Sequence, residues 1–222
     1  MSSFSKLKLI ALILLLSLGC VGSALSADDP AAELRAKAEA GDIQAQVELG
    51  QKYAMGRDVE TDFAAAKQWW EKAAAGGNTD ATFYLGVMYA QGDGVAQDMM
   101  KARELWEEAA DKDNTAALFK LGMLYTEGEV VQGDFTAAGH YFTRAAHLGH
   151  VQSQFNVSIL FDRGLGVEQN KFAAYAWAKL AAESGHPNAL ELVAQLEGEF
   201  NEEQLAAAQE EFAQLKAGLG KS

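Results

Sequence analysis

The sequence has very little cysteine and proline. Its 222 residues include a single cysteine, Cys20, and only two prolines. One cysteine excludes an internal disulfide and cysteine-rich metal sites, so the fold must be stabilised by packing alone. Apolar residues make up 49% of the chain, and together with the scarcity of proline this composition favours a compact helical fold over disorder.

Basic residues are also few. Lysine and arginine total 18 against 31 acidic residues, and the formal net charge is −13. Nucleic acids and anionic lipid surfaces repel a chain of this charge. We therefore expect protein partners, with no nucleic acid among them and no direct binding to a membrane surface.

Only one long apolar run is present, and it lies near the N-terminus. Lys6 and Lys8 precede it, and the run extends from Leu9 to Leu18. A membrane span needs about 20 apolar residues, so this run is too short to cross a bilayer comfortably. Small residues follow it as far as Ala27, which is typical of a secretory signal. The sequence predicts a signal peptide over residues 1–27, export to a bacterial periplasm, and a net charge of −15 after cleavage.

Cys20 allows a second interpretation of this leader. In a lipoprotein signal, Cys20 would become the acylated first residue and would anchor the chain in the membrane. Gly19 fits that pattern, whereas Ser17 does not, because a leucine usually stands three residues before the lipidated cysteine. Simple cleavage and lipidation at Cys20 both remain open, and the sequence indicates no oligomeric state.

The rest of the chain repeats with a period of 36 residues. Four positions of the repeat show this step most clearly, each in four copies without insertion. They are Leu49, Leu85, Leu121 and Val157; then Gly50, Gly86, Gly122 and Ser158; then Gly56, Gly92, Gly128 and Gly164; and finally Val59, Val95, Val131 and Val167. A fixed period of this length predicts a stacked array of helical repeats. The valines are apolar positions in a loop, and we expect them to pack that loop against the core.

Each repeat is predicted to contain two helices, here called helix A and helix B. Helix A ends at a glycine such as Gly56, which accepts the left-handed conformation without strain. Helix B begins at a good N-cap residue in every copy. These N-cap residues are Asp62, Asp98, Asp134 and Asn170. The predicted boundaries are repeats at about 42–77, 78–113, 114–149 and 150–185, an N-terminal cap helix at 28–41, and a degenerate repeat with a C-terminal cap helix at 186–222.

Two further features bear on packing. Gly50, Gly86 and Gly122 lie in the middle of helix A, where glycine costs about 1 kcal/mol relative to alanine. We expect a close approach of the alanine rows of helix B at these positions. At the C-terminal end, Pro187 is predicted to open a helix that carries Leu190, Val193 and Leu196, and Asn201 is predicted to cap the final helix.

The repeat pattern resembles that of a known family. The pattern A-x-x-x-L-G-x-x-Y-x-x-G, then V, then D-x-x-x-A-x-x-x-W-x-x-A-A is present from Ala45 to Ala74 and from Ala81 to Ala110. It resembles the Sel1-like repeat, a relative of the tetratricopeptide repeat. The resemblance implies an all-α, right-handed α/α superhelical solenoid that serves as an interaction adaptor in a bacterial envelope. The fourth repeat departs most, with Val157-Ser158 and Phe161 in place of Leu-Gly and Tyr.

Two other functions remain open as alternatives. Some secreted Sel1-like proteins with paired cysteines have been described as binding or cleaving β-lactams, which suggests an envelope enzyme or a binder of cell-wall fragments. The chain after residue 27 has no cysteine, so the features of that group do not carry over. A flagellar stator-associated periplasmic protein resembles this size and layout, which suggests a structural subunit of an envelope or flagellar-motor complex.

Positions that vary among the copies indicate a binding surface. In helix A these positions form one stripe, and the A helices of α/α superhelices usually line the concave side. The middle of the stripe would present an apolar strip with a polar rim, which suits a partner helix or an extended peptide. The strip comprises Tyr84, Val87, Met123 and Ile159, and the rim comprises Lys120, Asn156 and Arg163. The alternative is that Val87, Met123 and Ile159 only pack between adjacent A helices.

The sequence indicates no catalytic residue, metal site or cofactor. His147, His150 and His186 fall at turns between helices, where we expect them to be solvated, and His140 lies on a helix B with no acid or nucleophile suggested nearby. A metal site needs three or four converging ligands. We therefore predict that the protein is not an enzyme.

Overall fold

The computed structural model describes residues 31–128 and 133–219. The predicted signal peptide, Cys20 and Val131 lie outside the described residues. Within the described ranges the chain forms eleven α-helices and no strand, which confirms the all-α prediction.

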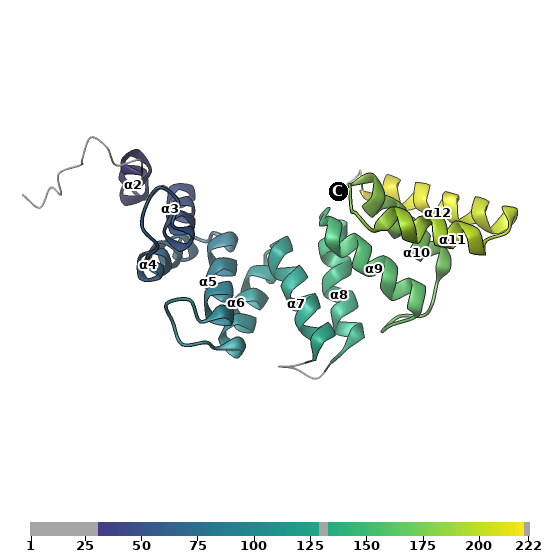
Figure 1. The fold of residues 1–222 in the computed structure, drawn as a ribbon, viewed down its shortest axis with the longest axis horizontal. Coiled ribbons are helices and arrows are strands. Elements are labelled where there is room, and N and C mark those ends of the chain that lie inside the picture. Colours follow the sequence, from purple (N-terminus) through teal and green to yellow (C-terminus); the bar gives the residue numbers. More distant parts are fainter. Residues whose placement is uncertain (1–30, 129–132, 220–222) are drawn as a thin grey trace, which may run out of the picture.

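Helices A and B alternate along the chain, and every one of these eight helices has 13 residues (Figure 1). The A helices are α3 (Ile43–Met55), α5 (Thr79–Gln91), α7 (Thr115–Glu127) and α9 (Val151–Arg163). The B helices are α4 (Phe63–Ala75), α6 (Met99–Asp111), α8 (Phe135–His147) and α10 (Lys171–Glu183). The terminal helices are α2 (Ala32–Glu39), α11 (Ala189–Glu199) and α12 (Glu202–Leu219).

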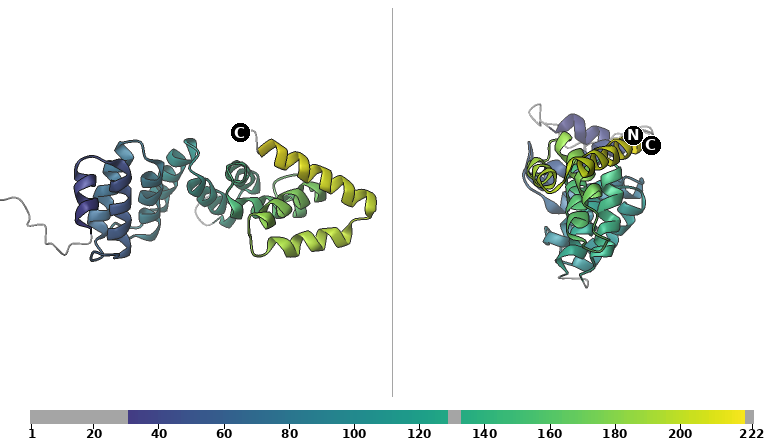
Figure 2. Two further views of the ribbon diagram at one scale, coloured as in Figure 1. Left: turned by 90° about the horizontal axis from the view of Figure 1, so that it is seen from above. Right: turned by 90° about the vertical axis from the view of Figure 1, so that its right-hand side faces the viewer.

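The helix pairs stack into an elongated, curved array. The helices from α2 to α11 pack mainly against their neighbours in sequence, whereas α12 packs on α10. In Figure 1 the N-terminal and C-terminal ends rise on either side of the middle repeats. Figure 2 shows α12 turning back from the far end of the array. The core is a chain of local clusters, as expected of a solenoid, in which each repeat contacts only its neighbours.

The predicted helix boundaries are confirmed. Each of the four B helices has an N-cap side chain that accepts a hydrogen bond from a backbone N–H of the first turn; in α6, for example, Asp98 accepts from Lys101 at 2.9 Å. Each A helix ends at a glycine in the left-handed conformation, with φ between 64° at Gly56 and 79° at Gly92. The loop residues Val59, Val95 and Val167 pack against core clusters, as expected.

The mid-helix glycines are in close contact with helix B, but the partner differs from the prediction. Aromatic rings lie over these glycines where alanine rows were expected. A Cβ atom built on Gly86 would lie 2.5 Å from Nε1 of Trp106, and one built on Gly50 would lie 2.4 Å from Nε1 of Trp70. Gly122 has the same relation to Phe142. Glycine is therefore required because a ring fills the space that a side chain would occupy.

The fourth repeat differs from this arrangement. Ser158 occupies the glycine position, and Ala178 occupies the position of the ring. Both residues are completely buried. The ring moves by one residue to Trp177, which packs with Phe142 and Val157 in the neighbouring cluster. A small residue at the ring position thus accompanies the larger residue at the glycine position, and the repeat keeps its register.

The C-terminal cap agrees only in part with the prediction. Val193 and Leu196 are buried in α11, but Leu190 is 66% exposed and Leu192 occupies the buried position instead. The buried face of α11 is formed by Ala189, Leu192, Val193 and Leu196, and Leu190 lies outside it, contrary to the prediction. Asn201 caps α12 as predicted: its side chain accepts from the backbone N–H of Gln204, whose side chain accepts from the N–H of Asn201. This reciprocal pair is a capping box.

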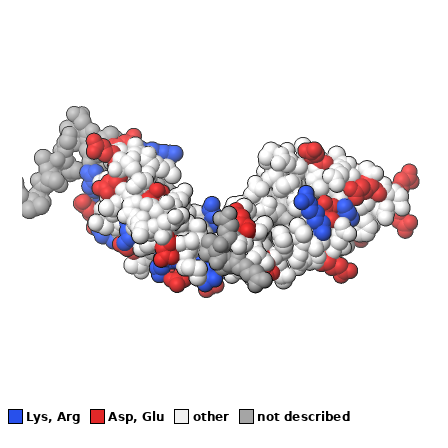
Figure 3. Space-filling view, turned by 60° about the horizontal axis from the view of Figure 1, so that its bottom comes forward, with Lys and Arg blue, Asp and Glu red and all other residues white. Residues whose placement is uncertain are grey.

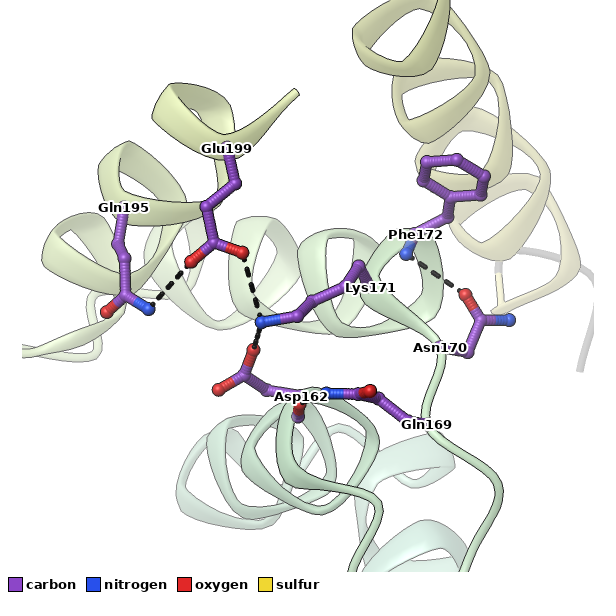
Figure 4. Close-up of polar contacts among 7 residues, drawn as sticks. All are labelled: Asp162, Gln169, Asn170, Lys171, Phe172, Gln195 and Glu199. Carbon is purple, nitrogen blue, oxygen red and sulfur yellow. Dashed lines mark hydrogen bonds and ion pairs between the residues drawn. The ribbon is translucent and has the colours of Figure 1, made fainter. Parts of the chain in front are cut away.

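Lys171 joins the cap to the fourth repeat (Figure 4). Its ammonium group lies 2.7 Å from a carboxylate oxygen of Asp162 and 3.1 Å from one of Glu199. The hydrogen bond to Asp162 is the main cause that raises the pKa of Lys171 above its usual range. A cavity of about 690 Å³ lies beside this network, and its lining includes the paired side chains of Lys171 and Glu199.

Candidate functional site

A predominantly apolar cavity lies between the first two repeats. It has a volume of about 380 Å³ and is formed mainly by the last turns of α3 and the C-terminal half of α5, with α4 beneath them. We call it the α3–α5 pocket. The residues that line it are Gln51, Ala54, Met55, Phe63, Trp70, Phe83, Tyr84, Val87, Met88, Gln91 and Asp93. Pockets that bind ligands usually measure about 300 to 1,000 Å³, so this one is large enough for one or two apolar side chains.

Two aromatic rings form the floor of the pocket. Trp70 and Tyr84 stack with their centroids 5.2 Å apart and an angle of 23° between the planes. The indole N–H of Trp70 donates to the carbonyl of Val47 at 3.2 Å, and the hydroxyl of Tyr84 accepts from Gln51 Nε2 at 2.7 Å. Because these polar atoms already have partners, the floor presents mainly ring faces and aliphatic carbon to an occupant.

The rim of the pocket is open and polar. Met55 is 56% exposed there, and Gln91 is exposed beside it. Asp93 supplies the one charged side chain among the lining residues. Within the described part of the chain, its carboxylate has no hydrogen-bond or ion-pair partner.

The electrostatic environment of the pocket is negative. The A helices end at this pocket, so the carbonyl ends of the α3 and α5 dipoles both point toward it. The last turn of α5 has no basic residue, and Lys52 in the last turn of α3 is paired with Asp58. Acidic side chains are spread over both halves of the face in Figure 3, with basic side chains among them.

The predicted strip divides into two parts. Tyr84 and Val87 line the α3–α5 pocket. Met123 packs against the cluster around Phe142, and Ile159 packs against the cluster of the C-terminal cap. All four side chains are half-buried, so they pack between neighbouring helices and also keep an accessible edge.

The predicted rim follows the same helix faces farther along the array. Lys120 and Arg163 are exposed, and Asn156 is half-buried. None of them lines the α3–α5 pocket. Tyr84 is the one aromatic residue at its repeat position, where the other copies have Glu48, Lys120 and Asn156. A tyrosine that stacks on the helix B ring is therefore available only where the first repeat meets the second.

The sequence did not point to most of the pocket wall. Trp70, Phe83, Met88 and Asp93 line the pocket, and none of them was singled out from the sequence. One signal was available for Asp93: the same repeat position is Arg57 in the first copy, Glu129 in the third and Leu165 in the fourth, so the charge at this position varies among the repeats.

The prediction that the turn histidines are solvated was wrong for two of them. His150 is the N-cap of α9, where its Nδ1 accepts from the backbone N–H of Ser153 at 3.2 Å and its ring lies 4.9 Å from that of Phe119. His186 is only 7% exposed and stacks on Phe155 at 4.1 Å. Burial lowers the pKa of both His150 and His186 below the usual range of histidine.

The other two histidines, His140 and His147, are exposed, as expected for His147. Among the residues that the structure describes, no three histidine, cysteine or acidic side chains come together as a metal site would require. Over the same residues, no helix is both long and apolar enough to cross a membrane.

Comparison with known proteins agrees with the repeat boundaries. The family model of the Sel1 repeat matches residues 43–78, 79–114, 115–150 and 151–186, within one residue of the predicted repeats. No curated protein sequence matches the chain.

Several solved structures are similar. One is c5321, a protective antigen of uropathogenic Escherichia coli with an SLR fold, at 32% identity and a TM-score of 0.70; the match covers 79% of this chain and 38% of that one. The present chain thus spans well under half the length of the antigen. A Sel1 repeat protein from Oxalobacter formigenes matches at 27% identity and a TM-score of 0.70, with 85% and 76% of the two chains covered. Immunity protein Pa5087 of Pseudomonas aeruginosa, at 18% identity and a TM-score of 0.51, covers 84% of this chain and 73% of its own, and shares the fold alone.

Proposed function

This chain belongs to the Sel1 repeat family, and we propose that it is an exported adaptor of the bacterial envelope that binds a partner helix or peptide on the face of its A helices. Sel1 repeat proteins are generally protein–protein interaction modules, and their solenoid is typically a non-catalytic scaffold. Binding on this face involves no covalent step.

The α3–α5 pocket is the observation on which this proposal rests. It is an apolar cavity that is open at the surface, in an array where aromatic rings lie against the mid-helix glycines of the A helices. Its walls come from helices held in place by the repeat packing, so the site needs little rearrangement to bind. Preformed apolar pockets with a polar rim are the usual binding sites of anchor side chains.

The proposal of export rests on residues 1–27. A basic start, an apolar run of signal-peptide length and small residues before Ala27 support secretion into the periplasm. Fractionation of cells that express the full chain tests this step. A protein recovered in the periplasm without its leader supports it, membrane-bound protein that is released by Cys20→Ser supports the lipidated form, and full-length protein in the cytoplasm contradicts export.

Crosslinking in the native envelope, followed by mass spectrometry, tests the binding face. The parent is compared with a variant carrying Tyr84→Ala, Val87→Ser, Met123→Ser and Ile159→Ser, once circular dichroism shows that the variant is folded. Because these side chains are half-buried, a second variant, Met55→Lys, places a cation at the exposed rim without disturbing the core. A variant with Met100→Ser and Leu148→Ser is the matched control, because these exposed apolar residues belong to the B-helix side.

A partner that the parent and the control retain, and that both A-face variants lose, supports the proposed function. A partner held equally by all four proteins places the interface elsewhere and contradicts it. Capture of no protein at all, together with turnover or binding of a peptidoglycan fragment by the purified chain, would replace the proposal with the cell-wall alternative.

A further inference from the structure

We propose that the occupant of the α3–α5 pocket is a peptide segment of a partner protein that inserts a large apolar side chain between Trp70, Tyr84 and Val87 and places a lysine or arginine against Asp93. This inference rests on the proposed function and adds the chemistry of the partner. It follows from three properties of the pocket: its apolar floor, the unpaired carboxylate of Asp93 at its rim, and the direction of the helix dipoles.

The floor selects an apolar group. The indole N–H of Trp70 and the hydroxyl of Tyr84 already take part in internal hydrogen bonds, at 3.2 Å and 2.7 Å. Apart from the hydrogen of the Tyr84 hydroxyl, which accepts from Gln51 and can still donate, the floor offers a polar side chain no partner, so burying one there costs free energy. An aliphatic or aromatic side chain loses nothing of this kind and gains contact with two ring faces.

The rim selects a cation. Asp93 has no partner among the described residues, and it lies directly after Gly92, the C-cap of α5. The negative end of the α5 dipole therefore adds to the charge of the carboxylate. The last turn of α3, which forms the opposite wall, has the same polarity, and its single base, Lys52, is already paired with Asp58. No lining residue is basic, so an acidic peptide would be repelled.

The neighbouring amides are suited to a peptide. Gln91 is exposed beside Asp93, and Gln51 donates to Tyr84 through its nitrogen, which leaves its carbonyl oxygen free to accept. An amide side chain both donates and accepts, which matches the two hydrogen-bonding groups of a peptide unit. A peptide backbone that crosses the rim would thus carry its apolar side chain down into the pocket and its basic side chain across to Asp93.

Removing the charge of Asp93 breaks no contact among the described residues, because its carboxylate has no hydrogen-bond or ion-pair partner there. The same repeat position is Arg57 in the first copy, Glu129 in the third and Leu165 in the fourth. Asp93→Asn keeps the shape of the side chain and removes only the charge. Ala54→Leu is the complementary change, because Ala54 lines the pocket and extra carbon there fills the space that an anchor would use.

Selection from a displayed library of random 12-residue peptides tests the inference. The bait is the chain from residue 28, and enriched peptides are synthesised and measured by fluorescence polarisation against the parent, Ala54→Leu, Asp93→Asn and the remote control Glu191→Gln. Circular dichroism first establishes that each variant is folded. We expect enriched peptides to share a leucine, methionine or aromatic residue within about four residues of a lysine or arginine.

For such peptides we expect Ala54→Leu to weaken binding more than tenfold. Asp93→Asn should weaken it about three- to fivefold at low salt, as for a single rim ion pair, and the difference should shrink as salt is raised. Glu191→Gln, on the exposed side of α11, should leave affinity unchanged.

Enriched peptides that lack a basic residue, or that bind Asp93→Asn as tightly as the parent, would overturn the inference about the partner. If those peptides still lost affinity for Ala54→Leu, the proposed function would stand, and only the requirement for a basic residue opposite Asp93 would fail. If no enriched peptide responded to Ala54→Leu, the pocket would not be a peptide site and both proposals would have to be abandoned.

Discussion

Replacing Gly86 by alanine should destabilise the array, although alanine is the better helix former. Gly86 lies in the middle of α5, and a Cβ atom there would lie 2.5 Å from Nε1 and 2.6 Å from Cδ1 of Trp106, with the carbonyl oxygen of Ala102 at 3.2 Å. The ring cannot move freely, because Trp106 is 4% exposed and its N–H donates to the carbonyl of Phe83 at 3.3 Å.

The magnitude follows from three opposing contributions. Overpacking of a filled core costs about 1 to 3 kcal/mol. Loss or distortion of the Trp106 hydrogen bond adds about 1 kcal/mol. The higher helix propensity of alanine offsets about 1 kcal/mol of this cost. We expect the free energy of unfolding to fall by about 2 kcal/mol, which corresponds to a melting temperature about 4 to 8 °C lower for a chain of this length.

Gly198→Ala is the matched control. Gly198 also lies inside a helix, α11, but a Cβ atom there would have no atom within 4 Å. The same substitution should therefore stabilise the protein by up to about 1 kcal/mol. Urea unfolding followed by far-ultraviolet circular dichroism measures both variants against the parent. A Gly86→Ala protein at least as stable as the parent would refute the reasoning.

A double-mutant cycle with Trp106→Ala identifies the cause. If the ring is responsible, Gly86→Ala should cost nothing, or should stabilise, in the Trp106→Ala background. An equal cost in both backgrounds would assign the effect to something other than the ring. The fourth repeat already contains the compensated pair, since Ser158 faces helix B where the ring position is Ala178.

Two further predictions concern helix caps. His150 caps α9 with an unprotonated nitrogen, and burial lowers its pKa below the ordinary value of 6.5, so the folded state binds a proton less readily than the unfolded state. The stability due to this cap is present above pH 6.5 and is lost as the pH falls below it. Urea midpoints should therefore fall less between pH 7 and pH 5 in His150→Asn than in the parent, and parallel profiles would contradict this.

Asp98→Ala removes the cap of α6 and should lower the free energy of unfolding by about 1 kcal/mol, whereas Asp98→Asn should keep most of the stability that the cap provides. Equal urea midpoints for these two variants would argue against the cap.

Local features were predictable because the residues that cause them are adjacent in sequence. The helix ends at Gly56 and its counterparts depend on one backbone conformation, and the starts at Asp62 and its counterparts depend on a side chain that reaches its own first turn. Repetition made these signals visible four times over. The failure at Leu190 occurred where the repetition ends, because no second copy exists to show which face of α11 is buried.

The candidate site was only half predictable. Tyr84 and Val87 were found because their positions vary among the repeats while the rest of helix A stays constant. The floor under them was missed, because Trp70 repeats as Trp106 and so resembles pure packing. Asp93 was missed because it lies outside both helices, in a loop whose position relative to the pocket no local pattern encodes.

By itself the sequence determined the repeat period, the helix boundaries, the caps and the absence of a disulfide, since each depends on composition or on residues within one turn of each other. Contacts between helices were decided only by the tertiary structure: the rings over Gly50 and Gly86, the burial of His150 and His186, and the opening of a pocket at the first junction of the array. These contacts depend on how side chains from different helices share a volume, and that volume exists only once the repeats have stacked.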